Sequence, residues 1–496
     1  MKYILNTFNC LHTLAWRDYL VGISAYGAFL PRRRLQRKAI AKANSWFDSS
    51  LKSLSKGERT MCGWDEDSIT MAVEAARDLT HPLSPQTIIL ASTTHPFAIR
   101  QNSGIIAEAL NITEDVRTMD VSGSLKASTN GLLAAIDIAN SRDEEVLVLA
   151  SDNRKARAGS HTEILSGDGA AAFIISKDIE VAKFVNSASI NTDFIDHFRA
   201  SGDTFDYAWE DRWIRQEGWL KIVPKTINKL LKKSNISSSD IDHLIVPCQF
   251  KRVPESVAKA CNISLDSVVD PMIDSVGQCG TAHPLIMLSQ ILEKSTPGQK
   301  ILLTSFGQGC DAILFEVTDS ILNSRPKCGV NGYLKRKVEE TNYDKFLTFN
   351  GVVDREFGKR AELDRPPALT AQYRNREGVT GLNGGCCKQC GTIQYPKSNY
   401  CVNPNCGAKN TQETYCMSNA SAKVKTFTAD HLVFSMEPPA YLGLIEFDGG
   451  GRMMVEFTDI DSDNFDVGTN VRMHFRIKHI DVKRGLKQYF WKAAPK

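Results

Sequence analysis

The sequence lacks the features that would place it in several special classes of protein. It has no run of about 18 consecutive apolar residues, so it predicts no membrane-spanning helix. Lys and Arg number 60 against 57 Asp and Glu, and this near balance gives no reason to expect a nucleic-acid partner. Residues 1–19 lack the pattern of a secretory signal peptide, and we interpret them as an N-terminal extension.

Because no secretory signal is evident, the thirteen scattered cysteines indicate reduced thiols and a cytoplasmic protein. Two cysteine pairs stand out, because each has a close spacing and is followed by a glycine, Gly391 or Gly407. Four thiolates arranged in this way are typical of a structural, tetrahedral zinc site without an open position. The second pair is spaced more widely than usual, and four unpaired structural cysteines are the alternative. The predicted ligands are Cys387, Cys390, Cys401 and Cys406.

Residues 20–320 alternate between strand-like and helical patterns, which predicts an α/β architecture with buried sheets. Strands are expected at 19–26, 85–92, 144–151, 170–176, 242–246, 300–305 and 311–317. Helices are expected at 32–43, 67–80, 103–110, 133–140, 219–233, 254–261 and 282–294. The two halves repeat a similar order of elements, which fits an internal duplication.

The pattern changes after residue 320. Residues 321–380 are dense in charge and contain Arg365-Pro-Pro, so we interpret them as a helical connector that lies across both domains. Short, alternating, β-rich runs follow from residue 420, and Asp448-Gly-Gly-Gly451 is a hairpin signal. These runs predict a small antiparallel barrel.

The stretch around which the chain is organised runs from Asp120 to Leu132. Small residues crowd a turn between a predicted strand and a predicted helix, a place where the helix dipole favours a thiolate nucleophile. The stretch resembles the nucleophile elbow of 3-hydroxy-3-methylglutaryl-CoA synthases and type III ketoacyl synthases, in the thiolase superfamily. Those families carry Ala-Cys where this chain has Ser124-Leu125.

Two further motifs carry the same resemblance. Gly167-Asp-Gly-Ala-Ala-Ala172 is similar to the glycine turn before a core strand of the superfamily, and Ser305-Phe-Gly-Gln-Gly309 is similar to its active-site glycine loop. Each motif alone is compatible with an ordinary tight turn. Together they extend the resemblance over about residues 20–320, which implies a five-layered αβαβα thiolase-like fold and a homodimer.

The resemblance implies three catalytic positions, normally glutamate, cysteine and histidine. This chain has Thr93, Leu125 and Pro247 there, and none of these side chains ionises near neutral pH. A one-residue shift of the alignment would bring Thr94 or Cys248 nearer the chemistry, but neither restores the set.

Other polar residues lie in segments that the resemblance assigns to the pocket. Gln278 stands near the position of an oxyanion-hole asparagine, and His283 lies at a helix start. His197 and Tyr207 belong to a segment expected to lie over the pocket. A lone histidine is more often a structural residue than a base. Candidate contacts for coenzyme A phosphates are Lys251 and Arg252, for which a solvated basic turn is the alternative.

The C-terminal part resembles an acyl-CoA-associated family in which a zinc ribbon precedes an OB-fold barrel. The matching residues are 381–418 for the ribbon and 419–496 for the barrel. Members of that family commonly partner thiolase-superfamily proteins. An OB barrel alone can bind nucleic acid, but its fusion to this α/β domain favours a coenzyme A thioester.

Two functional hypotheses follow. In the first, the protein makes or breaks a carbon–carbon bond on an acyl-CoA without an acyl-cysteine intermediate. A retro-aldol reaction on a 3-hydroxyacyl-CoA needs only a base, for which His283, His197 or Tyr207 are the candidates, and an oxyanion hole. In the second, the protein is a non-catalytic scaffold or substrate-channelling subunit beside an active thiolase.

Overall fold

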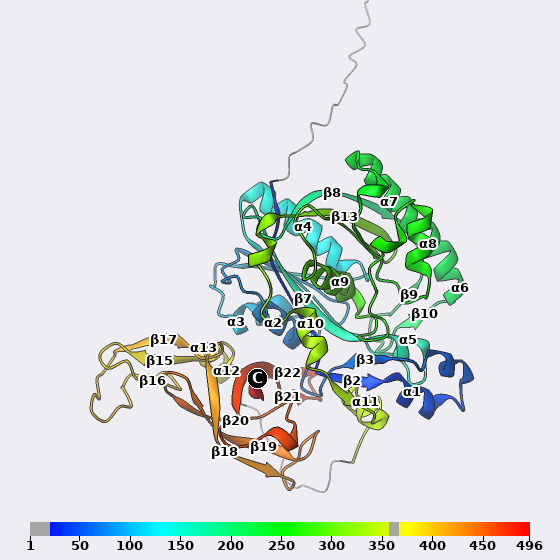
Figure 1. The fold of residues 1–496 in the computed structure, drawn as a ribbon. Helices are drawn as coiled ribbons and strands as arrows, with labels where there is room; N and C mark the ends of the chain where they lie inside the picture. Colours follow the sequence, from blue (N-terminus) through cyan, green and yellow to red (C-terminus); the bar gives the residue numbers. More distant parts are fainter. Residues whose placement is uncertain (1–19, 357–366) are drawn as a thin grey trace, which may run out of the picture.

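A computed structural model describes residues 20–356 and 367–496 of the chain. The predicted N-terminal extension and most of the Arg365-Pro-Pro segment lie outside the described residues. A large α/β body carries a smaller unit beneath it in the view of Figure 1, formed by strands β15 to β22. Within the described ranges, no helix has the length and apolar character needed to cross a membrane.

The body is built on one nine-stranded sheet with the order β11-β12-β13-β8-β1-β7-β6-β4-β5. Its first-half strands are β1 (Gly22–Phe29), β4 (Thr87–Ala91), β5 (Arg117–Val121), β6 (Val146–Asn153) and β7 (Asp168–Ser176). Its second-half strands are β8 (Ala182–Asn191), β11 (His243–Ile245), β12 (Lys300–Phe306) and β13 (Gly309–Val317). Strands β1 and β4 are buried along their whole length, as expected for strands covered on both faces.

The strand order supports the predicted duplication. The first half reads β5-β4-β6-β7-β1 and the second reads β11-β12-β13-β8, so each half ends on its own first strand. A parallel bridge between Leu244 and Val268 stands outside β11, where the first half has β5. The halves meet where Gly22 and Ile23 of β1 pair with Lys183 and Ala182 of β8.

The two halves of the sheet form two layers and helices form three more, which confirms the predicted αβαβα fold. Helices α2 (Ser68–Arg77) and α3 (Asn102–Ala109) pack on the first half, and α7 (Leu220–Ser234) and α8 (Val253–Ala260) pack on the second. Helices α4 (Ala127–Arg142) and α9 (His283–Leu292) contact each other, and α9 touches strands of both halves. Shorter elements are α5 (His161–Leu165), β9 (His197–Phe198), β10 (Tyr207–Ala208) and α6 (Asp211–Trp213), and a π-helical segment, Ile214–Trp219, leads into α7.

The helix expected at 32–43 is partly wrong. Its first residues form strand β2 (Arg33–Gln36), and only then does helix α1 (Arg37–Asn44) begin. Strand β2 pairs with β3 (Glu58–Met61) and with β14 (Val338–Glu340). Strand β14 belongs to the connector and lies about three hundred residues later in the chain. Its pairing with β2 favours a strand over a helix at these residues.

The connector is therefore not wholly helical. Helices α10 (Gly329–Lys335) and α11 (Tyr343–Phe349) pack on the body. Helices α12 (Leu369–Arg374) and α13 (Arg376–Val379) lie beside the smaller unit, so the connector contacts both parts, as expected.

The smaller unit consists of a ribbon and a barrel. The ribbon strands are β15 (Asn383–Cys387), β16 (Ile393–Gln394) and β17 (Gln412–Cys416), in the order β16-β15-β17. The barrel strands are β18 (Ser421–Asp430), β19 (Ala440–Phe447), β20 (Arg452–Glu456), β21 (Asn470–Asp481) and β22 (Leu486–Pro495). All neighbouring barrel strands are antiparallel, and a bridge between Phe457 and Ala493 joins the end of β20 to β22. This confirms the predicted antiparallel barrel.

The barrel docks on the body through buried charges. Glu74 of α2 accepts a hydrogen bond from the Phe475 amide of β21 at 3.1 Å. Arg476 of β21, which is fully buried, lies 3.0 Å from Glu66 of the body. We call this contact the charged seam; it comprises Asp65, Glu66, Asp67 and Glu74 of the body and Arg472, His474, Arg476, Lys487 and Lys492 of the barrel.

Candidate functional site

The predicted elbow lies where the carboxyl ends of the parallel strands β4, β5 and β6 meet, the usual edge for ligands in α/β sheets. It follows β5 and leads into helix α4. Ser124 Oγ donates a hydrogen bond to the Gly307 carbonyl at 2.8 Å and accepts one from the Lys126 amide at 3.3 Å. The Ser124 hydroxyl proton is therefore held by a carbonyl that cannot take it away.

The glycine loop lies directly against this elbow. A Cβ on Gly307 would stand 2.6 Å from Ser124 Oγ and 3.1 Å from the Leu125 amide nitrogen, so a larger residue would push the two segments apart. Amides at the start of α4 thus face the loop that the sequence assigns to the site. Such amides at a helix N-terminus can stabilise a developing oxyanion.

Lys126 brings a positive charge to the elbow that sequence reasoning missed. Its Nζ lies 3.4 Å from Asp311 Oδ1, and Thr129 donates its hydroxyl proton to the other carboxylate oxygen at 2.8 Å. A charged residue inside a turn of small residues was the available signal.

Asp152, at the end of β6, organises the segment around the family glutamate position. Thr93 donates both its amide, at 2.7 Å, and its hydroxyl, at 2.9 Å, to this carboxylate. The Thr281 amide, in the loop before α9, donates to it at 2.7 Å. Ser92 and Thr94 complete a set of five hydrogen bonds. Asp152 is fully buried, so it acts as an anchor for three segments of the chain.

A second polar group links Gln278 to the hairpin formed by β9 and β10. Gln278 accepts a hydrogen bond from Arg154 at 3.2 Å, and Arg154 pairs with Asp206 at 2.7 Å. Asp206 also pairs with Arg199, which donates to the Thr93 carbonyl. Burial acts to raise the pKa of Asp206, but Arg154 and Arg199 outweigh it and lower the pKa, so the carboxylate stays ionised.

The hairpin carries two predicted site residues, His197 and Tyr207. His197 Nδ1 lies 3.0 Å from Asp196, and its side chain is half-buried. Tyr207 is 56% exposed and rests against Phe198, with 5.4 Å between ring centroids. The structure thus brings Gln278 into the polar group beside Thr93, whereas it places Tyr207 largely in solvent.

His283 is enclosed at the start of α9. Its Nδ1 accepts a hydrogen bond from the Cys279 amide at 3.3 Å, and its Nε2 donates to the Pro271 carbonyl at 2.9 Å. Burial lowers the pKa of His283 to about 4. A neutral ring with both nitrogens bonded inside the protein has the arrangement of a structural histidine.

The segment at the family histidine position is also enclosed. Pro247 and Cys248 are buried, and burial raises the pKa of the Cys248 thiol, so the thiol stays protonated. Lys251 and Arg252 follow in an exposed turn. Arg252 has a φ of +63° and directly precedes helix α8, so both basic side chains are available to solvent at a helix start.

The four predicted zinc ligands come together in the ribbon. Their sulfur atoms all lie within 4.8 Å of one another. Cys390 and Cys401 are 3.5 Å apart, and Cys387 and Cys406 are 3.9 Å apart, close to the roughly 3.8 Å that tetrahedral zinc–thiolate bonds require. A hydrogen bond with Thr411 is the main cause that lowers the pKa of Cys387 to about 6, which favours the thiolate. The residues fit a structural zinc ion.

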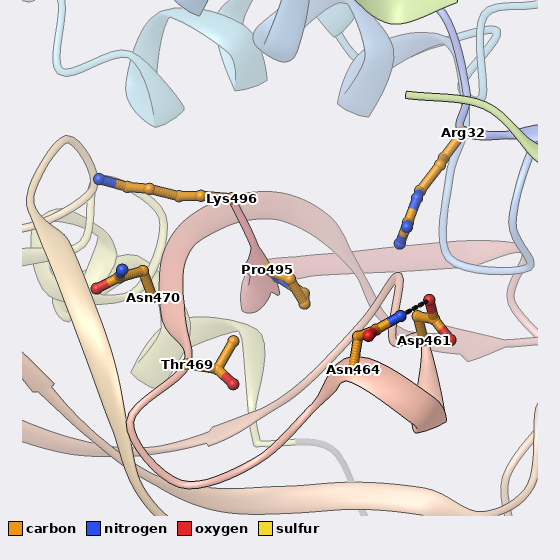
Figure 2. A pocket seen from close by; sticks show the side chains of 7 residues that line it. All are labelled: Arg32, Asp461, Asn464, Thr469, Asn470, Pro495 and Lys496. Carbon is orange, nitrogen blue, oxygen red and sulfur yellow. Dashed lines mark hydrogen bonds between the residues drawn. The ribbon is translucent and has the colours of Figure 1, made fainter. Parts of the chain in front are cut away.

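Two cavities lie away from these residues. One, of about 410 Å³, opens between Arg32 of the body and the barrel residues Asp461 and Asn464, which lie next to each other and share a hydrogen bond (Figure 2). The other, of about 340 Å³, lies beside Phe194 and Trp213, between the end of β8 and the start of α7. Neither is lined by a residue predicted for the site.

Comparison with protein-family models gives three matches. Residues 231–316 match the C-terminal part of 3-oxoacyl-[acyl-carrier-protein] synthase III. Residues 382–412 match the rubredoxin-like zinc ribbon domain of ChsH2, and residues 417–476 match its C-terminal OB-fold domain.

Curated relatives cover the α/β body. A hydroxymethylglutaryl-CoA synthase from Aeropyrum pernix is 30% identical over 329 residues, which span 64% of this chain and 91% of the relative. The corresponding synthase from Pyrococcus furiosus is 29% identical over 331 residues, spanning 64% and 92%.

Solved structures show the same fold. An HMG-CoA synthase complexed with CoA has a TM-score of 0.56 and 19% identity, covering 69% of this chain and 92% of its own. A 3-oxoacyl-(acyl carrier protein) synthase III from Pseudomonas aeruginosa has a TM-score of 0.52 and 18% identity, covering 60% and 98%.

Proposed function

Because the chain belongs to the hydroxymethylglutaryl-CoA synthase family, we propose that its body binds an acyl-CoA thioester and makes or breaks a carbon–carbon bond without an acyl-cysteine intermediate. The observation that carries this proposal is an elbow that keeps its geometry but has lost its nucleophile. Leu125 supplies no thiolate, and the Ser124 hydroxyl donates to a carbonyl instead of to a base.

The chemistry we propose is an aldol or retro-aldol reaction on a 3-hydroxyacyl-CoA. A base takes the proton of the 3-hydroxyl group, the bond between C2 and C3 breaks, and its electron pair forms the thioester enolate. The Leu125 amide at the elbow is our candidate donor for the enolate oxygen. Lys251 and Arg252, exposed before α8, are our candidates for the coenzyme A phosphates.

One observation favours the second function, a non-catalytic subunit. The polar side chains near the site form hydrogen bonds with other parts of the protein, as seen for Asp152, Gln278 and His283. A body whose polar residues serve its own loops, fused to a docked barrel, suits a scaffold or channelling partner of a thiolase.

The remaining partners are proposed on structural grounds. We propose one structural zinc ion per chain and a division into body (20–320), connector (321–380), ribbon (381–418) and barrel (419–496).

Strand β5 is the last strand of its sheet, and its Met119 is 40% exposed. An open edge of this kind can pair with the same strand of a second copy, which supports a homodimer. The abundance of free thiols supports a cytoplasmic location.

Incubation with a panel of 3-hydroxyacyl- and 3-oxoacyl-CoAs tests the proposal. Products are detected by mass, with and without a candidate thiolase. Turnover by the purified chain alone supports the enzyme. Turnover that requires the thiolase, and persists when the chain's own site is altered, supports the scaffold.

A further inference from the structure

The cavity of about 340 Å³ between the end of β8 and the start of α7 takes no part in the function proposed above. Its volume lies in the range of pockets that hold small molecules. Apolar side chains and two lysines line most of it, namely Ile190, Phe194, Trp213, Ile222, Lys221 and Lys225. We call it the aromatic cavity. A site with an apolar wall and cations at its mouth suits a molecule that has both an apolar and an anionic part.

The aromatic wall of this cavity is held in place by packing. Phe194 and Trp213 stack, with 5.6 Å between their ring centroids and 9° between their ring planes. Phe194 is buried, and its ring also contacts Phe306, with 5.9 Å between centroids. Trp213 remains 46% exposed despite the stacking. A ligand would therefore cover apolar surface that is already ordered, which lowers the entropy cost of binding.

The charges that line the cavity favour an anion. Lys221 and Lys225 lie four residues apart on α7, so their side chains leave the helix on the same side. Lys221 pairs with Glu217 at 2.5 Å, whereas Lys225 has no acidic partner among the described residues. Two cations and one carboxylate give the cavity a net positive charge.

The backbone beside the cavity is unusual. Ile214–Trp219 is π-helical; Trp213 directly precedes this segment and Glu217 belongs to it. Such wide turns are rare in proteins and are frequent at functional sites. A Cβ on Gly218 would stand 2.8 Å from Phe306 and 3.0 Å from Phe194, so glycine lets the segment lie directly on these two rings. The π-helical segment is an observation independent of the lining that also indicates a functional site.

The inner wall of the cavity is continuous with the glycine loop. Phe306 belongs to that loop and contacts Phe194. The Thr192 amide, beside the cavity, donates a hydrogen bond to the Gln308 carbonyl at 3.5 Å. Gly307, between these two loop residues, accepts the hydroxyl of Ser124. A molecule in the cavity would thus rest on the back of the loop that faces the elbow.

We propose that the aromatic cavity is a binding site for an amphipathic anion. Its planar or aliphatic part packs against Phe194 and Trp213, and its anionic group lies at Lys221 and Lys225. Two kinds of molecule have this chemistry, an adenine nucleotide and an aliphatic carboxylate. The inference goes beyond the proposed function, because no residue of the elbow takes part in binding.

Calorimetric titration of the full chain tests the site and distinguishes the two kinds of ligand. The probes are ADP and octanoate, and the neutral controls are adenosine and octanol. Binding of ADP but not adenosine identifies a nucleotide site, and binding of octanoate but not octanol identifies a carboxylate site. If neither anion binds, the inference is overturned.

Variants locate the binding. Trp213→Ala removes the apolar wall, and its matched control is Trp209→Ala, because Trp209 is 48% exposed and does not line the cavity. Loss of stacking should weaken ADP binding by about 5- to 150-fold. Lys221→Ala combined with Lys225→Ala should weaken binding of either anion by about tenfold, whereas Lys232→Ala, on the same helix, should change nothing. Unchanged affinity in both cavity variants overturns the inference.

Photolabelling of the unaltered chain covers the case in which the variants do not fold, which their melting temperatures would show. An azido derivative of ADP and a diazirine carboxylate should label peptides within residues 190–194 or 213–225. An excess of the parent anion should suppress this label. Label that falls only on other peptides contradicts the assignment. Turnover is not measured in any of these experiments, so their failure leaves the proposed function as it stands.

Discussion

Replacing Glu74 by Gln should undock the barrel from the body. The Glu74 side chain is fully buried in the charged seam, 2.8 Å from Arg77 and 3.2 Å from His474. It also accepts the Phe475 amide at 3.1 Å. Glutamine keeps one acceptor oxygen for that amide but removes the negative charge, which leaves the guanidinium group of Arg77 without its carboxylate in a buried place.

The expected loss of folding free energy follows from the burial of the Glu74 side chain. Removing one partner of a buried ion pair costs about 3–5 kcal/mol, and because one hydrogen bond survives we expect about 3 kcal/mol. Proteins are stable by only about 5–15 kcal/mol, so this is a large fraction. The loss should appear first as undocking, since the charge lies between the two parts of the molecule.

Trp491 reports on the seam. Its indole donates to the Thr380 carbonyl at 2.7 Å, and the Arg77 guanidinium lies 4.9 Å from its ring centroid. Urea unfolding followed by tryptophan fluorescence and by circular dichroism should show a transition at lower urea in the variant. The control is Glu413→Gln, which removes an exposed pair with Lys388 and should cost no more than about 1 kcal/mol. Equal midpoints for Glu74→Gln and the unaltered protein would refute the reasoning.

The same residue predicts a pH dependence. Burial acts to raise the pKa of Glu74, but Arg77 and His474 outweigh it and hold the pKa well below its usual range. The stabilisation is therefore fully present above the unfolded pKa of about 4.3 and is lost as the pH falls through the folded value. Glu74→Gln should lack this loss of stability in acid.

The other predictions concern the metal, the dimer and the elbow. Cys390→Ser should lose zinc by metal analysis and unfold the ribbon, while circular dichroism of the body persists. Met119→Asp should reduce the solution mass from twice 55.0 kDa to the mass of one chain, because it places a charge at the open edge of β5. Incubation with a labelled acyl-CoA should leave no label on the peptide 124–128, because Ser124 has no base beside it; recovery of label there contradicts a non-covalent mechanism. His283→Asn should lower the melting temperature yet leave kcat unchanged, since both ring nitrogens bond inside the protein.

Much of the fold could be read from local pattern. The strand around Thr87–Ala91 is a continuous apolar run, and helix α2 begins at the capping residue Asp67, the residue predicted to start it. The cysteine pairs likewise predicted the metal site, because the ligands of each pair are close in sequence. These features depend on neighbours along the chain, which is why the sequence contains them.

Contacts between distant segments could not be read in this way. Strand β2 is a strand because β14 pairs with it from the connector. The anchor at Asp152 depends on Thr281, and its donors lie on two loops, one after β4 and one before α9, that only the folded sheet brings together. His283 matched a pocket segment, yet whether a histidine is a base depends on what its two nitrogens touch.

The charged seam also bears on which barrels this body will accept. Hydrophobic docking tolerates substitution of one apolar surface by another, but a buried carboxylate accepts only a partner that supplies a cation at the same point. A related barrel with a neutral residue in place of Arg476 would leave Glu66 and Asp459 charged and enclosed. The positions of the buried charges in the seam thus let the body discriminate its own barrel from others of the same fold.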